Sequence, residues 1–289
     1  MKKLLILSGK GGTGKTTTAA SFIRFSEAKA FADCDVDAPN LHIVSKINAE
    51  PSVRDYYGID KAEIDPAKCL NCGKCASLCR FGSIKNLDGH FEIDEFGCEG
   101  CGVCVEVCPA KAISLKADAA GKLALYKASE TFATAELKMG RGNSGKLVSE
   151  VKSLMTDAAP DAALAIIDGS PGIGCPVIAS VTGVDLALIV TEPSASGLSD
   201  LKRLLHTSDI LRVKVAVCIN KYDACPQKAQ EIKEFCEKEN IAFVGFLPFD
   251  KKASHAINHG LSVADIDCPL RDALRQVYEK TMALLEVKL

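Results

Sequence analysis

The sequence has no long apolar run, no surplus of positive charge and no tryptophan. No stretch of about 18 apolar residues occurs, so we expect no membrane-spanning helix and no integral membrane contact. The 35 Lys and Arg face 37 Asp and Glu, and a net charge of −2 gives no basic footprint for nucleic acid. The apolar run after Met1–Lys3 is too short for a signal peptide, so we expect a cytoplasmic protein.

What the sequence does contain begins at Leu4–Ser8, an apolar run typical of a strand, which enters a glycine-rich turn. The turn reads Gly9-Lys10-Gly11-Gly12-Thr13-Gly14-Lys15-Thr16-Thr17 and matches the pattern G-x-x-x-x-G-K-[ST], with a helix expected over Thr16–Glu27. Backbone N–H groups of such a loop converge on phosphate oxygens, and the helix N-terminus adds partial positive charge. We predict that Lys15 contacts the β- and γ-phosphates of a nucleotide and that the Thr16 hydroxyl binds Mg²⁺.

Apolar strands and helical stretches alternate over most of the remaining chain. The expected strands are 28–32, Leu164–Asp168, Leu186–Thr191, Val213–Asn220 and Ile241–Leu247. Continuous apolar strands that alternate with helices predict an α/β fold with a doubly wound, mostly parallel sheet, formed by 1–60 and 117–289. We expect Pro269–Leu289 to be a packing helix rather than a membrane anchor, because its basic residues are partly offset by acidic ones.

Fourteen cysteines are many for a cytosolic chain, where metal or redox chemistry is a better explanation than disulfides. Eight of them form two runs with ferredoxin spacing, C-x-x-C-x-x-C-x-x-x-C, the second of which is followed by Pro109. Three closely spaced thiolates cap one cluster, and the fourth reaches across to the other cluster. The spacing therefore predicts one [4Fe–4S] cluster on Cys69, Cys72, Cys75 and Cys108, and another on Cys98, Cys101, Cys104 and Cys79.

These runs predict that 61–116 is a small α+β domain of bacterial-ferredoxin type, inserted into the α/β domain. Arg80 stands where proline usually follows the first run, which removes no ligand. Zinc also binds C-x-x-C pairs and is the competing metal, although two tandem runs of four cysteines fit zinc ribbons poorly.

Carboxylates follow two of the expected strands. Asp33, Asp35 and Asp37 come just after the strand 28–32, at the sheet edge where α/β proteins bind ligands. Asp168 ends the strand Leu164–Asp168 and precedes a glycine–proline turn. A carboxylate at the position of Asp168 is suited to hold Mg²⁺, directly or through water, beside a loop that senses the γ-phosphate.

The chain resembles the MinD/ParA/Mrp-like P-loop ATPases of the SIMIBI class, which are related to the nitrogenase iron protein, and more closely those that carry an inserted ferredoxin domain. The resemblance rests on Gly9–Thr17, on Asp33, Asp35 and Asn40, on the cysteine runs, and on Asp168–Gly172. It implies an Mg²⁺-dependent ATPase in which Lys10, the extra lysine of a deviant Walker A loop, crosses a dimer interface to the partner's phosphates. It further implies that Asp35 orients the attacking water, that Asp33 lies near the Mg²⁺ shell and that Asp168 belongs to the second switch.

The resemblance also implies that Asn220 lies near adenine and that Pro248 and Asp250 belong to a second loop that contacts the base. Asn220-Lys221-Tyr222-Asp223 also reads as the guanine-selecting pattern N-K-x-D, so GTP stays a minority alternative to ATP.

Cys175 lies at the offset from Asp168 at which the nitrogenase iron protein has a ligand of its bridging cluster. The loop 140–146 that would carry the second ligand has no cysteine, so we expect Cys175 to be a structural or dimer-proximal thiol. The same loop is either a second anion site or an ordinary helix start capped by Ser144 or Asn143. The remaining thiols and the pair His255 and His259 are expected to be structural; these thiols are Cys34, Cys218, Cys225, Cys236 and Cys268.

The leading hypothesis is a dimeric ATPase that couples its nucleotide state to two low-potential [4Fe–4S] clusters. Its partner is expected to be a second copy or a related ATPase, together with a redox protein or a protein that carries a metal–sulfur centre. Two alternatives are a ferredoxin-type carrier that nucleotide merely stabilises, and a MinD-like positioning ATPase, which leaves the cysteines unexplained.

Overall fold

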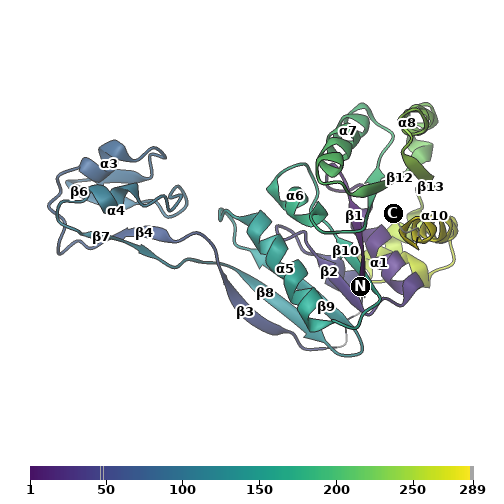
Figure 1. Ribbon diagram of the computed structural model, residues 1–289, viewed down its shortest axis with the longest axis horizontal. Helices are drawn as coiled ribbons and strands as arrows, with labels where there is room; N and C mark the ends of the chain where they lie inside the picture. Colours follow the sequence, from purple (N-terminus) through teal and green to yellow (C-terminus); the bar gives the residue numbers. More distant parts are fainter. Residues whose placement is uncertain (46, 48, 287–289) are drawn as a thin grey trace. The chain divides into compact units, whose positions relative to one another are not determined.

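The computed structural model describes every residue except 46, 48 and 287–289. Within the described residues, a nine-stranded sheet has the order β13-β12-β11-β1-β10-β2-β9-β8-β3 (Figure 1). Its strands are β1 (Lys2–Leu7), β2 (Ala30–Asp33), β3 (Ser52–Tyr57), β8 (Ala119–Lys127), β9 (Thr131–Leu137), β10 (Leu164–Asp168), β11 (Leu186–Thr191), β12 (Lys214–Asn220) and β13 (Ala242–Leu247). Every neighbouring pair from β13 to β9 is parallel. The expected α/β fold with a mostly parallel sheet is confirmed.

Helices cover both faces of this sheet. They are α1 (Lys15–Ser26), α2 (Leu41–Ser45), α5 (Ser144–Ala158), α6 (Cys175–Val181), α7 (Ala195–Ile210), α8 (Pro226–Lys238), α9 (Lys251–Asn258) and α10 (Pro269–Glu286). α1 packs against α10, α5 packs against α6 and β2, and α7 packs against β11 and β12. The last three residues of the predicted C-terminal helix lie outside the described part of the chain.

The alternation of side chains along β1 shows why two layers of helices are needed. Leu4 and Ile6 join a core with Phe22 of α1 and Leu274 of α10. Leu5 and Leu7 point to the opposite face, because successive strand residues alternate, and are also fully buried. A strand that is apolar at every position therefore requires cover on both sides.

Two compact units divide the chain. The larger, which we call the nucleotide domain, comprises 1–53, 123–136 and 144–289, and the smaller, which we call the insertion, comprises 54–122 and 137–143. The insertion contains two antiparallel pairs, β4 (Lys61–Ile64) with β7 (Ile113–Lys116) and β5 (Ile84–Leu87) with β6 (His90–Ile93). It also contains the short helices α3 (Lys74–Leu78) and α4 (Val103–Val107).

Candidate functional site

The phosphate-binding loop connects β1 to α1 and is held by the end of β12. The Asn220 amide donates to the carbonyl of Thr13 at 2.7 Å, and the Lys221 ammonium donates to the carbonyl of Gly12 at 3.0 Å. Gly14 has a φ of 94°, and a Cβ there would lie 2.3 Å from the Asn220 amide nitrogen. A glycine is therefore required at 14 both by the backbone conformation and by the close approach of Asn220.

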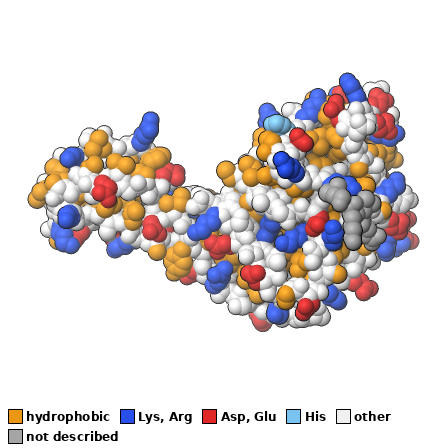
Figure 2. Space-filling model, viewed as in Figure 1, with side chains coloured by type: hydrophobic (Ala, Val, Ile, Leu, Met, Phe, Trp, Pro, Cys, Tyr) orange, Lys and Arg blue, Asp and Glu red, His pale blue; other side chains and the backbone are white. Residues whose placement is uncertain are grey.

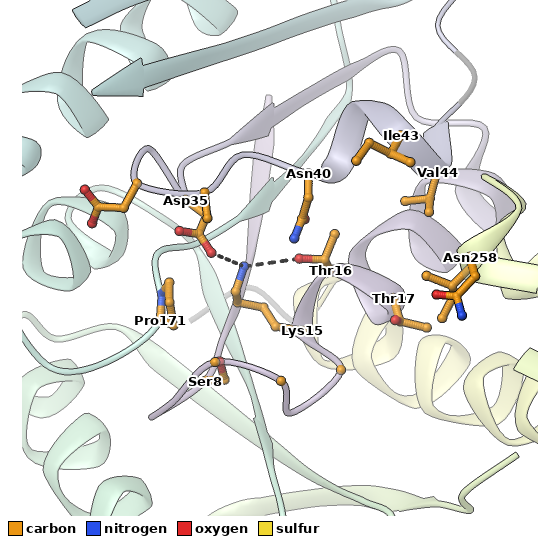
Figure 3. A pocket seen from close by; sticks show the side chains of 16 residues that line it. Ser8, Lys15, Thr16, Thr17, Asp35, Asn40, Ile43, Val44, Pro171 and Asn258 are labelled. Atoms are coloured by element: carbon orange, nitrogen blue, oxygen red, sulfur yellow. Dashed lines mark hydrogen bonds and ion pairs between the residues drawn. The ribbon is translucent and has the colours of Figure 1, made fainter. Parts of the chain in front are cut away.

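Lys15, at the start of α1, lies among carboxylates from two other strand ends, of which Figure 3 shows Asp35. Its ammonium is 2.7 Å from Asp168 and 3.7 Å from Asp35. The Thr16 hydroxyl donates to the second oxygen of Asp168 at 2.6 Å. Four of the residues that the sequence singled out for phosphate and Mg²⁺ chemistry thus lie within one small group.

Charge and burial shift the pKa values in this group. Burial by itself would lower the pKa of Lys15, but the charge and hydrogen bond of Asp168, with Asp35 and Asp33, raise it overall. Burial raises the pKa of Asp35, although the nearby Lys15 opposes the change. Lys15 is therefore a permanent cation at neutral pH, suited to attract phosphate oxygens.

Asp33 has a different environment from the one expected for an Mg²⁺ neighbour. Its carboxylate is fully buried and accepts three backbone N–H groups, from Asp35 at 3.0 Å and from Asn40 and Leu41 at 2.9 Å each. Burial and the charge of Asp168 raise the pKa of Asp33 to about 7. In this structure Asp33 holds the loop that carries Asp35, and it does not line the cavity described next.

A cavity of about 780 Å³ opens beside Lys15, Thr16 and Thr17. Its far wall is formed by Ile43 and Val44 from α2 and by Ile257 and Asn258 at the end of α9, as Figure 3 shows for three of them. These wall residues could not be predicted from local patterns, because α2 and α9 carry no motif.

The residues predicted to contact the base do not line this cavity. Asn220 is used by the phosphate loop, and Pro248 lies in the turn after β13. The Asp250 carboxylate caps α9 by accepting the backbone N–H of Lys252. One oxygen of Asp223, the aspartate of the guanine pattern, accepts the backbone N–H of Phe249 at 2.9 Å.

Lys10 is held within its own chain by a residue that the sequence analysis did not single out. Its ammonium lies 2.8 Å from Glu192, just after β11, and the other oxygen of Glu192 lies 2.7 Å from Lys221. Burial opposes ionisation of Glu192, but the two lysines lower its pKa overall. Glu192 stands alone between β11 and α7, so nothing in its local sequence indicates that it pairs with the distant Lys10.

The eight cysteines of the insertion line two separate cavities. One cavity is lined by Cys69, Cys72, Cys75 and Cys108, which we call the first thiol set. The other is lined by Cys79, Cys98, Cys101 and Cys104, which we call the second thiol set. The structure therefore brings together the same two sets of four that the spacing predicts, each with one cysteine from the other run.

Hydrogen bonds to sulfur make the first thiol set suitable for an iron–sulfur cluster. The N–H groups of Asn71 and Ala112 point to the sulfurs of Cys69 and Cys108, at 3.4 and 3.3 Å. Such donors stabilise thiolates and tune a bound cluster. No three His, Cys, Asp or Glu side chains among the described residues are grouped to hold a single metal ion, so the fit rests on the four-thiol cavities.

Of the other cysteines, four are buried: Cys34, Cys218, Cys236 and Cys268. Burial raises the pKa of each of these thiols, so they are protonated and unreactive at neutral pH. Cys175 is exposed at the start of α6, close to the backbone of Gly145 at the start of α5. His255 and His259 stack on each other with ring centroids 4.2 Å apart.

The model of one protein family covers most of the chain. The family described as CobQ/CobB/MinD/ParA nucleotide binding domain matches residues 4–263. The chain belongs to this family. The phosphate loop of this chain lies between the first strand and the first helix. No described helix is long and apolar enough to cross a membrane.

Relatives and solved structures agree with this assignment. An uncharacterized protein of Methanocaldococcus jannaschii is 32% identical over 288 residues, covering 96% of this chain and 95% of its own. An iron-sulfur cluster carrier protein of Pyrococcus abyssi is 27% identical, covering 98% of this chain and 86% of its own. Two solved structures, each 17% identical, share the fold alone. They are the ATP complex of Cyanothece McdA(D38A), with a TM-score of 0.59 and coverage of 100% and 98%, and the Mg-ADP complex of Pyrococcus horikoshii MinD, with a TM-score of 0.57 and coverage of 100% and 99%.

Proposed function

We propose that the protein is an Mg²⁺-dependent ATPase that couples its nucleotide state to two [4Fe–4S] clusters in the insertion, for electron transfer or for transfer of a metal–sulfur centre to a partner protein. The observation that carries the proposal is the presence, in one chain, of a phosphate loop with Lys15 beside Asp35 and Asp168, and of two four-thiol cavities. The names of the iron-sulfur cluster carrier relatives support it.

In the proposed reaction Lys15 exchanges its carboxylate partners for phosphate oxygens, which it contacts together with the loop N–H groups of Gly9–Thr17. Thr16 and Asp168 bind Mg²⁺, directly or through water, and the buried Asp33 fixes the loop that precedes Asn40. Asp35 orients the attacking water. No covalent intermediate is needed, because positioning and charge stabilisation carry phosphoryl transfer.

Lys10 is proposed to act across a dimer of two such chains, or of this chain with a related ATPase. It must then leave Glu192, so ATP binding and the separation of this ion pair are linked. Nucleotide binding would bias an equilibrium between open and closed dimers, and hydrolysis would release it. The relationship to the nitrogenase iron protein stays a prediction.

The first and second thiol sets would each hold one [4Fe–4S] cluster through four thiolates. When bound, such clusters supply one-electron chemistry at low potential. The chain's own contribution is to present the thiolates, to donate N–H groups to sulfur and to exclude water with the apolar residues around them, such as Ile84, Ile93 and Ile113.

Two measurements test this proposal. Lys15→Ala should abolish ATP turnover while the visible absorption of the clusters stays, whereas Lys228→Ala, on the surface of α8, should change neither. Equal turnover in the wild type and Lys15→Ala would reject the ATPase. Anaerobically purified protein that contains zinc, without iron and acid-labile sulfide, would reject the clusters.

Competition binding decides the nucleotide. We expect ATP to displace a labelled nucleotide better than GTP does, since Asp223 already accepts the backbone N–H of Phe249. A ferredoxin-type carrier that nucleotide merely stabilises predicts cluster reduction that is independent of ATP and ADP, which an anaerobic reduction assay with either nucleotide measures.

A further inference from the structure

The chain segments that carry most of the two thiol sets differ in charge. The segments that carry the first thiol set, 68–75 and 108–111, contain three lysines and no acidic residue. The segment 94–106, which carries three members of the second thiol set, contains four acidic residues and no basic one. Because charges near a cluster guide charged partners, the two ends of the insertion present different surfaces to a redox protein.

Ion pairs reduce this difference without changing its sign. Lys68 lies 2.9 Å from Asp65, and Glu95 lies 2.6 Å from Arg141. Within these segments, Lys74 and Lys111 near the first thiol set and Glu99 and Glu106 near the second have no ion pair with another described residue. Arg80 follows Cys79 of the second set, and the Lys61 ammonium reaches the carbonyl of Cys98, so the charge around that set is mixed. The first thiol set keeps Lys74 and Lys111 next to its cysteines in the sequence.

The second thiol set is also partly covered by the chain itself. The Lys61 ammonium, at the start of β4, donates to the carbonyl of Cys98. A Cβ at Gly100 would lie 2.3 Å from the carbonyl oxygen of Asp60. The turn at Gly100 therefore packs directly against the residue that precedes β4. Part of the surface around the second set is thereby used within the insertion.

The first thiol set is also open to the surface. Leu70, between two of its cysteines, is 68% exposed, and Cys72 is exposed beside it. Leu70 and Lys74 both line the cavity of this set. Figure 2 shows apolar side chains exposed on the surface of the insertion. An exposed apolar residue beside unpaired lysines is the arrangement of an interface with an apolar centre and a charged rim.

We infer that the surface formed by Leu70, Lys74 and Lys111 is the docking site of an acidic one-electron carrier protein, which exchanges electrons through the first thiol set. The inference rests on the proposed function, because it requires a cluster on these thiolates. The exchange moves one electron from the reduced carrier to the oxidised cluster, and no bond forms or breaks.

The test uses the full-length, cluster-loaded protein and a reduced plant-type [2Fe–2S] ferredoxin as the acidic probe. In the wild type, the second-order rate of electron exchange, measured by stopped flow, falls steeply as ionic strength rises. The double variant Lys74→Glu/Lys111→Glu slows the exchange about tenfold or more at low ionic strength. The matched control, Glu99→Lys/Glu106→Lys, makes an equal and opposite change near the second thiol set and does not slow it.

Three results would overturn the inference: a rate that is independent of salt, equal slowing by both double variants, or slowing by the control alone. Titration calorimetry with oxidised ferredoxin gives a second readout, in which binding is lost only in the lysine variant. If that variant does not fold, Lys74→Gln/Lys111→Gln removes the same two positive charges and is expected to slow the exchange by a smaller factor.

Cluster analysis separates this inference from the proposed function. Iron, acid-labile sulfide and the electron paramagnetic resonance signals of the reduced protein are measured first. Protein without four-iron clusters overturns the proposed function. Protein with both clusters in the wild type and both variants, but with exchange rates that do not follow the charges, overturns only the docking site.

Discussion

The nucleotide domain and the insertion are stabilised in different ways. The nucleotide domain has a large apolar core in which Phe31 and Phe132 stack at 5.1 Å between the sheet and its helices. One buried apolar cluster of the insertion has five residues, of which two, Cys75 and Cys98, are members of the thiol sets. Small domains bury too little apolar surface to be stable on packing alone, so we expect the insertion to depend on what its cysteines bind.

We therefore expect the nucleotide domain to fold before it binds its ligand, and the insertion to fold only together with what its cysteines bind. In the nucleotide domain the polar groups of the site, such as Asp33, are anchored by backbone hydrogen bonds without any ligand. In the insertion two of the proposed cluster ligands, Cys75 and Cys98, belong to the buried apolar cluster.

Removal of iron should have the largest effect and should be confined to one unit. Anaerobic chelation is expected to unfold the insertion and leave the nucleotide domain folded, because the proposed ligands Cys75 and Cys98 lie in a buried cluster of the insertion. Amide hydrogen exchange measures this as loss of protection in 61–116 with unchanged protection in β1 and β10. Retained protection in 61–116 would show that the apolar residues suffice.

A substitution that leaves a cavity in the apolar core should destabilise the nucleotide domain. Phe132 is 1% exposed, and Phe132→Ala is expected to lower the free energy of unfolding of the nucleotide domain by about 3–5 kcal/mol. The control Phe249→Ala removes the same ring from a position that is 49% exposed and should change stability by less than about 0.5 kcal/mol. Denaturant unfolding measures both, and equal losses would contradict the assigned core.

Nucleotide should stabilise the nucleotide domain alone. At a concentration of about 100 times its Kd, Mg-ATP is expected to add about 2.7 kcal/mol, because it binds only the folded form. Differential scanning calorimetry should show the upward shift in the transition of this domain, with no shift in Lys15→Ala. An equal shift in that variant would mean that ATP binds elsewhere.

The last prediction concerns pH. The raised pKa of Asp33, about 7 against 3.8 in the unfolded chain, means that the folded state keeps a proton that the unfolded chain releases. The free energy of unfolding in the absence of nucleotide should therefore fall as pH rises from about 4 to 7. Asp33→Asn should flatten this dependence in urea titrations. An unchanged slope would assign the proton to another group.

Local patterns allowed much of the fold and site to be predicted. β1, β10 and β11 are continuous apolar runs, and the phosphate loop is a contiguous motif. The two thiol sets follow from the two cysteine runs, in which the fourth cysteine of each run joins the set of the other run.

The missing parts depend on distant contacts. β3 and β9 were not predicted because β3 is mostly exposed at a sheet edge and β9 is rich in Thr and Ala. The pairing of Lys10 with Glu192 and the cavity wall at Ile43 and Asn258 exist only because the sheet brings remote segments together.

The entry and exit of the insertion have a consequence for protein engineering. The chain leaves the sheet after β3 and returns at β8, and these strands are hydrogen-bonded neighbours at the end of the sheet. The N–H of Gly58 donates to the carbonyl of Asp118 at 3.1 Å, so the two ends of the excursion are already joined. A short turn grafted between them could replace everything from 59 to 117, and another module of any size could be installed there, without disturbing the core of the nucleotide domain.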